Sequence, residues 1–117
     1  YNLTTNATKI LFTYTSCCWI PLLVGGNNNW AVKATVSVTK RADTGKINSS
    51  PKTSVSPIVR VIDGCNATIN LLVADPDGDI VRCRWSNASD ECGSICSSFP
   101  GAVLNKDTCT ISFQATG

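Results

Sequence analysis

The residues at positions 71–85, LLVADPDGDIVRCRW, place an aspartate-rich turn between two apolar segments. Pro76 fixes the backbone φ angle and Gly78 permits a positive φ, so the central DPDGD suits a tight turn that joins two strands. Its aspartates also stand at alternate positions and offer three carboxylates to a calcium ion. The turn is the simpler interpretation, because the glutamate and the flanking helices of an EF-hand are missing. The candidate calcium ligands are Asp75, Asp77 and Asp79.

Segments in which apolar and polar residues alternate surround this turn and predict β-strands. The clearest is WAVKATVSVTK at 30–40, and KILFTYTSCCWI at 9–20 alternates in the same way. The turn-rich PLLVGGNNN joins these two segments, which predicts a β-hairpin. Further strands are expected at SPIVRVIDG, CNATINLLVA, IVRCRW and CTISFQA, and residues 86–108 are expected to form a loop.

The strand pattern predicts an all-β fold, namely an immunoglobulin-like β-sandwich stapled by disulfides. Apolar residues at helical spacing do not persist with caps over three turns. Residues 1–40 are expected to form N-terminal strands, as a hairpin or a donor-strand extension, and 41–57 a polar connection. Residues 58–117 are expected to form the immunoglobulin-like segment. A chain of 117 residues fits one compact domain.

The chain has seven cysteines and no histidine, which favours a disulfide framework over a zinc site. Alternation places Cys65, Cys83 and Cys109 on inward faces. It turns Cys17 and Cys18 to opposite faces, so these two are expected to have different partners. The pairing is otherwise open, and the odd cysteine either stays free and buried or bridges to a neighbouring chain. The candidate disulfide cysteines are Cys17, Cys18, Cys65, Cys83, Cys92, Cys96 and Cys109.

Asn-X-Ser/Thr sequons are more frequent than chance predicts. Ten asparagines occur in the chain, and five of them begin a sequon, against roughly two expected from the serine and threonine content. Together with the cysteines, the sequons predict a secreted protein that carries N-linked glycans. The candidate glycosylation sites are Asn2, Asn6, Asn48, Asn66 and Asn87, of which Asn48 is the weakest because Pro51 follows its sequon.

Composition argues against several classes of protein. The absence of histidine excludes Ser-His-Asp and Cys-His catalysis, and Glu91 is the sole glutamate, so we expect no enzyme. A net charge of +2 without a basic cluster does not favour a nucleic-acid partner. The longest apolar runs fall far short of the roughly 20 residues of a membrane-spanning helix. Without a signal peptide, the chain is expected to be a mature fragment or one unit of a longer polypeptide.

The segment SSPKTSVSPIVRVIDGCNATINLLVADPDGDIVRCRW, residues 49–85, resembles cadherin-like and immunoglobulin-like tandem repeats of large extracellular proteins. The likeness rests on a proline-led strand, a strand of TINLLV type, and DPDGD entering the next strand. The wider chain is similar to repeats of secreted glycoproteins of aquatic invertebrates. The resemblance implies a sandwich within a repetitive or polymeric extracellular protein, in which the motif aspartates bind calcium in some members.

The resemblance also raises a question about how the sandwich is closed. Such domains continue into a further strand, whereas no apolar stretch follows CTISFQATG. Other copies of the chain are therefore expected partners, each adding a strand to the next copy head-to-tail. The alternative is that residues 10–20 close the sheet of their own chain.

Two functions compete on these observations. The first is a structural protomer of an extracellular, heavily N-glycosylated filament or matrix. The second is a calcium-stiffened adhesion or receptor module that binds a ligand through the 86–108 loop. The candidate contacts of that second function are Trp19, Arg82, Arg84 and Phe99, although such residues more often belong to the core or to a solvated face.

Overall fold

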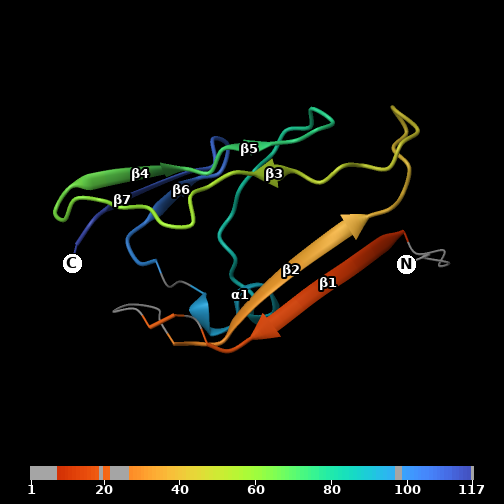
Figure 1. Cartoon of the computed structure of the whole chain (residues 1–117). Helices are drawn as coiled ribbons and strands as arrows, with labels where there is room; N and C mark the ends of the chain where they lie inside the picture. Colours follow the sequence, from red (N-terminus) through yellow and green to blue (C-terminus); the bar gives the residue numbers. More distant parts are fainter. Residues whose placement is uncertain (1–7, 19, 22–26, 97–98, 117) are drawn as a thin grey trace.

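The computed structural model describes residues 8–18, 20–21, 27–96 and 99–116, so Asn2, Asn6 and Trp19 lie outside the described residues. The chain is β-rich, with seven strands and two short helical turns among the described residues (Figure 1). The strands form three small sheets, ordered β1-β2, β3-β5 and β4-β7-β6. The elements are β1 (Lys9–Ser16), β2 (Trp30–Ser37), β3 (Lys52–Thr53), β4 (Asn66–Asn70), β5 (Val73–Ala74), α1 (Ser89–Cys92), η1 (Gly93–Ile95), β6 (Val103–Asn105) and β7 (Thr110–Gln114).

Strands β1 and β2 form the predicted hairpin. They pair antiparallel over their whole length, from Lys9 opposite Ser37 to Ser16 opposite Trp30. Residues opposite each other in an antiparallel pair lie on the same face. One face of the hairpin therefore collects most of the apolar positions of both strands, whereas Leu11 and Ala31 lie on the other face. The residues of the apolar face are Ile10, Phe12, Tyr14, Trp30, Val32, Ala34 and Val36.

The C-terminal sheet has an apolar face and a polar face. Strand β7 lies between β4 and β6, with Ile111 opposite both Ile69 and Leu104. Ala67 and Phe113 share this apolar face, and Ile111 is buried. The other face is polar except for Val103, and carries Asn66, Thr68, Asn70, Asn105, Thr110, Ser112 and Gln114. The alternation of the sequence thus sets the two faces of β4 and β7 as expected.

The segment CNATINLLVA forms two strands and not the single predicted one. Leu72 has a φ of 43°, and its backbone N–H donates to Oδ1 of Asn70 at 3.1 Å. This left-handed residue interrupts the extended backbone. As a result β4 pairs with β7, whereas β5 pairs with β3 in a separate sheet.

Two other predicted strands are wrong. Residues 56–64 contain a bend and a turn, and neither they nor residues 80–85 belong to a strand. A strand forms when its backbone makes repeated hydrogen bonds to a neighbouring strand. Among the described residues, the backbone of 80–85 makes a single hydrogen bond to another segment, in which the Cys83 N–H donates to the Lys106 carbonyl oxygen at 2.9 Å. Burial still alternates here, with Val81 and Cys83 half-buried and Arg82 and Arg84 exposed.

The segment 86–108, predicted as a loop, contains α1, η1 and β6. Helical periodicity cannot reveal a helix of four residues, because it spans about one turn. Gly93 follows α1 with a φ of +64°, and a Cβ atom there would lie 2.7 Å from the Asn29 carbonyl oxygen. Ser94 N–H donates to that same oxygen at 2.8 Å. Glycine thus allows the helical turns to pack against the start of β2.

The described residues form a small core. Five of them are buried, namely Ala31, Cys92, Cys109, Ile111 and Ala115. The radius of gyration is 17.2 Å, against about 13 Å expected for a globular chain of this length. Figure 1 shows why, since the hairpin with α1 and the C-terminal sheet lie apart and the chain between them is extended. Little of the apolar surface is therefore removed from water within one chain.

The Cys83–Cys109 disulfide closes a sequence separation of 26 residues, whereas Cys92–Cys96 closes one of 4. In the chain-entropy model, the longer loop contributes about 3.5 kcal/mol to the free energy of unfolding and the shorter one about 2 kcal/mol. We expect the double variant Cys83→Ala, Cys109→Ala to lose the larger amount in urea unfolding. Cys92→Ala, Cys96→Ala is the control, and an equal or larger loss in the control would contradict this ranking.

Candidate functional site

The DPDGD motif forms a turn between β5 and the 80–85 segment. The Gly78 N–H donates to the Asp75 carbonyl oxygen at 3.1 Å, and Gly78 has a φ of +79°. Oδ1 of Asp75 accepts the backbone N–H of Asp77 at 2.8 Å and that of Asp79 at 3.4 Å. The aspartate side chain thus caps the turn from inside, as the residue types predicted.

Arg41 binds the carboxylates on the outer side of this turn. Its guanidinium donates to both carboxylate oxygens of Asp79, at 2.9 Å for the Nη2–Oδ1 pair, and to both oxygens of Asp43 at 2.8 and 2.9 Å. Nη1 also donates to Oδ1 of Asn48 at 2.6 Å. Asp77 accepts the backbone N–H of Ser49 at 2.6 Å. One planar cation therefore ties the 41–49 segment to the aspartate turn.

These contacts shift the pKa values of the charged groups. Hydrogen bonds from Arg41 lower the pKa of Asp43 to about 2 and also lower the pKa of Asp79. The same hydrogen bonds raise the pKa of Arg41. Both carboxylates are therefore ionised at neutral pH and serve as acceptors, which suits a structural contact rather than proton transfer.

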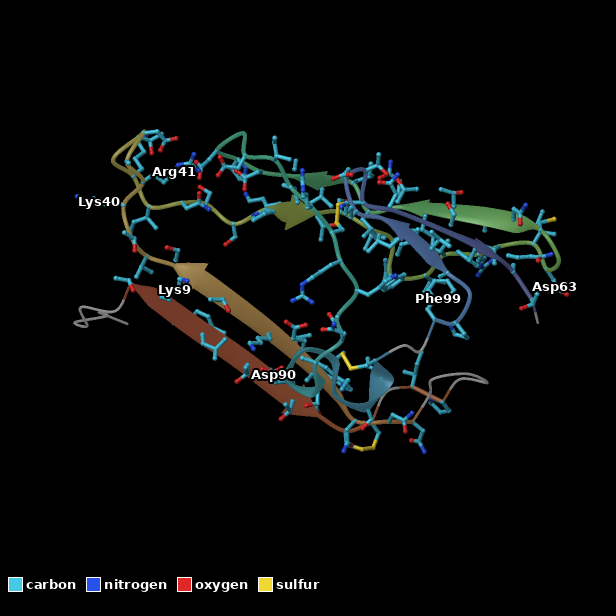
Figure 2. All side chains as sticks on the ribbon, turned by 180° about the vertical axis from the view of Figure 1, so that it is seen from behind. Lys9, Lys40, Arg41, Asp63, Asp90 and Phe99 are labelled. Carbon is cyan, nitrogen blue, oxygen red and sulfur yellow. A yellow bond between two sulfur atoms is a disulfide. The ribbon has the colours of Figure 1, made fainter. Side chains whose placement is uncertain are left out.

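No sequence pattern indicates Arg41 as a partner of the motif. It lies 38 residues before Asp79, and no local pattern links the two positions. The ion-pair network was therefore missed, although the polar connection that contains Arg41 was recognised. Figure 2 shows Arg41 at the end of the molecule opposite Asp63.

The predicted calcium ligands lie in one turn, but protein donors occupy much of their hydrogen-bonding capacity. Asp75 and Asp79 also line an open hollow of about 290 Å³, together with Asp107, Val81 and Cys109. Over the described part of the chain, His, Cys, Asp and Glu side chains do not gather in threes as a metal site would require. Calcium binding at Asp75, Asp77 and Asp79 therefore stays a prediction.

The Arg41 network is expected to make stability depend on pH. Folding lowers the pKa of Asp43 from 3.8 to about 2, so its contribution is complete above pH 3.8 and is lost as the pH falls toward 2. Thermal unfolding of the wild type and of Arg41→Ala should show a difference in Tm that is largest above about pH 4. The difference should shrink toward pH 2.

A matched control is available in Arg82, whose Nε lies 3.5 Å from Asp107 with both side chains mostly exposed. Such surface pairs contribute little, so Arg82→Ala should change Tm only slightly at any pH. A pH-independent loss of Tm in Arg41→Ala would show that the network does not act through its carboxylates.

Removing Arg41 also tests the predicted calcium site. Arg41→Ala leaves Asp79 without its cation, so the variant should show a larger rise in Tm with calcium than the wild type does, measured against EDTA. Magnesium serves as the control, because it demands a tighter octahedral shell. If neither protein responds to calcium, the prediction of a site at this turn is wrong.

The described sequons differ in their surroundings. Asn66 is exposed at the start of β4 and lies on the polar face of the C-terminal sheet. Asn87 is exposed just before α1. The amide of Asn48 is half-buried, and its Nδ2 donates to the Ser49 carbonyl at 2.7 Å while Oδ1 holds Arg41. Glycosylation stays a prediction at all of these sites, and Asn48 is again the least favourable.

The cysteines form three disulfides, Cys17–Cys18, Cys83–Cys109 and Cys92–Cys96. The expectation that Cys17 and Cys18 have different partners is wrong. Strand β1 ends at Ser16, so the alternation used for these two residues does not extend to them. The inward placement of Cys65 is also wrong. This cysteine precedes β4 and is free and exposed.

The candidate contacts of the 86–108 segment are engaged within the chain. Arg84 donates to both carboxylate oxygens of Glu91 at 2.6 and 2.8 Å, which lowers the pKa of Glu91. Phe99 packs edge-on against Trp85 and Phe113, with ring centroids 6.4 and 4.7 Å apart. Figure 2 shows Phe99 beside the C-terminal sheet. These residues therefore hold the segment in place.

Many large apolar side chains are exposed to solvent. On the hairpin, Phe12, Tyr14 and Val32 are 56, 59 and 53% exposed. Ile58 and Ile62 are also largely exposed in the segment before β4. Isolated exposed apolar residues are ordinary, but a contiguous set on one face marks an interaction surface. The hairpin face carries a contiguous set of exposed apolar side chains.

No helix of the described residues is long and apolar enough to cross a membrane. Comparison of the chain with protein-family models, with curated proteins and with solved structures finds no match.

Proposed function

We propose that the chain is a structural protomer of an extracellular, N-glycosylated filament or matrix, in which copies join through their β-structure. The observation that carries this proposal is the small core beside a large exposed apolar surface. A chain whose apolar residues stay in contact with water lowers its free energy by covering them. Other copies of the same chain supply a matching surface.

The positions of two sequons support the proposal. Asn66 lies on the polar face of the C-terminal sheet, opposite the face that carries Ile69 and Ile111. Asn87 is exposed beside α1. Neither residue belongs to the apolar face of the hairpin. Sugars at Asn66 and Asn87 would hydrate the outside of an assembly and leave the hairpin free to make contacts.

An immunoglobulin-like sandwich is the finer part of this proposal. Each described sheet is small, and the hairpin offers one apolar face without a second sheet against it. Two sheets that pack face to face bury their apolar side chains in a layer about 10 Å thick. We infer that strands from neighbouring copies complete this second layer.

A calcium-stiffened adhesion module is the second candidate. The hollow beside Asp75 and Asp79 favours it, since an ion there would rigidify the turn. It requires no association between copies, which separates the two candidates in one experiment.

The secreted, glycosylated chain should associate in a concentration-dependent manner in sedimentation velocity and form regular polymers in electron micrographs. Both measurements are made with calcium and with EDTA. Cys65→Ser is the control for accidental cross-linking through the free thiol. Association that persists in this variant and in EDTA supports the structural protomer. A monomer at every concentration would reject it, and association only with calcium would place the aspartate turn in the joint.

A further inference from the structure

The hairpin presents an open strand edge at β1. Strand β1 pairs with β2 on one side, and no described residue bonds to its backbone on the other side. The start of the β2 edge is different, because η1 lies there and Ser94 donates to the Asn29 carbonyl. An unpaired edge is a template for another strand. Among the described residues, β1 is therefore the edge that is open along its whole length, whereas the β2 edge is covered at its start.

The direction of each backbone group on β1 follows from one hydrogen bond. Val38 N–H donates to the Thr8 carbonyl at 3.0 Å, in the register that continues from Lys9 opposite Ser37. Hydrogen-bonded pairs alternate along an antiparallel ladder. Even-numbered residues of β1 therefore bond to β2. The residues whose N–H and C=O groups point away from β2 are Lys9, Leu11, Thr13 and Thr15.

The two faces of the hairpin differ in polarity. Ile10, Phe12 and Tyr14 lie on the apolar face, where Tyr14 packs against Trp30 with ring centroids 5.5 Å apart. Helix α1 covers part of the opposite face, where Lys33 pairs with Asp90 and Ala31 is buried. The apolar face carries no charged residue. A partner strand must therefore be apolar on this side.

We propose that β1 pairs antiparallel with β1 of a second copy, about a two-fold axis at Phe12. This inference rests on the proposed function and names its joint. The pairing gives a four-stranded sheet, β2-β1-β1-β2, with one continuous apolar face. It uses the outward backbone groups in hydrogen-bonded pairs, Lys9 with Thr15 and Leu11 with Thr13 of the second copy.

The charge and shape of β1 favour a second copy as the occupant. Lys9 is the only charged residue of β1. In the antiparallel register it faces Thr15 of the second copy, whereas parallel in-register pairing would place two Lys9 side chains side by side. On the apolar face Phe12 meets Phe12 of the second copy, and Ile10 meets Tyr14. Aromatic and aliphatic pairs of this kind stabilise sheets.

The β1 pairing is compatible with a polymer only if a second contact extends the assembly. A two-fold contact uses the same surface on both copies and therefore closes at two. The dimer is then the building unit, and its doubled apolar face remains available for the contact that extends the assembly. Failure of the β1 joint would leave a polymer that grows from other contacts.

Thr13→Pro tests the joint. Proline removes the outward N–H of Thr13, and proline is tolerated on the open side of an edge strand. The variant should keep the circular dichroism spectrum of the wild type but sediment as a monomer at concentrations where the wild type is a dimer. Thr13→Ala keeps the N–H group and should dimerise like the wild type. Phe12→Pro removes an N–H that bonds to β2 and should disrupt the hairpin itself.

A cross-linking experiment keeps the inference testable if Thr13→Pro does not fold. In the proposed register the two Phe12 residues face each other as a non-hydrogen-bonded pair, whose Cα atoms lie about 4.5 Å apart, within reach of a disulfide. Phe12→Cys on a Cys65→Ser background should form a covalent dimer under mild oxidation, whereas Thr15→Cys on the same background should not.

The outcomes separate this inference from the proposed function. If the wild type associates and Thr13→Pro associates equally well, or if both introduced cysteines cross-link to the same extent, the β1 joint is wrong while assembly stands. If the wild type remains a monomer throughout, both the joint and the assembly are rejected.

Discussion

The small apolar core is the constraint on which the rest of this structure depends. Folding orders every residue at a cost in conformational entropy, and burial of apolar surface is the main favourable term against it. Here five described residues are buried. Cross-links must therefore supply part of the order that a larger core would provide. The Cys83–Cys109 disulfide ties the 80–85 segment to the start of β7, and Arg41 ties the aspartate turn to the 41–49 segment.

The short helix α1 connects the hairpin to the rest of the chain. Asp90, labelled in Figure 2, pairs with Lys33 of β2, and Glu91 of the same turn pairs with Arg84. Gly93 allows close approach to the start of β2. Two ion pairs and one close backbone contact thus attach the hairpin to the rest of the chain through α1. This arrangement holds the hairpin in place while its apolar face remains uncovered.

Local chemistry determined how much of the fold could be predicted. The hairpin was predicted because its two alternating segments and the turn-rich connection between them are close together in the sequence. The DPDGD turn was predicted from its residue types. The strands at 56–64 and 80–85 were wrong, because alternation shows where side chains face but not whether a neighbouring strand exists. The pairing of Arg41 with Asp79 joins distant positions, so no local pattern could reveal it.

The cross-links help to keep the apolar face of the hairpin exposed. An apolar surface on a loosely held chain would collapse onto its own interior, since nothing would keep it apart from the remaining apolar residues. Disulfides and ion pairs restrict that collapse, because they fix segments without burying them. In the proposed assembly the hairpin would be ordered before it meets a partner, so association would lose less conformational entropy than the folding of a flexible segment. A chain that is ordered by disulfides and leaves an apolar face exposed is suited to burying that face against other copies, as the proposed assembly requires.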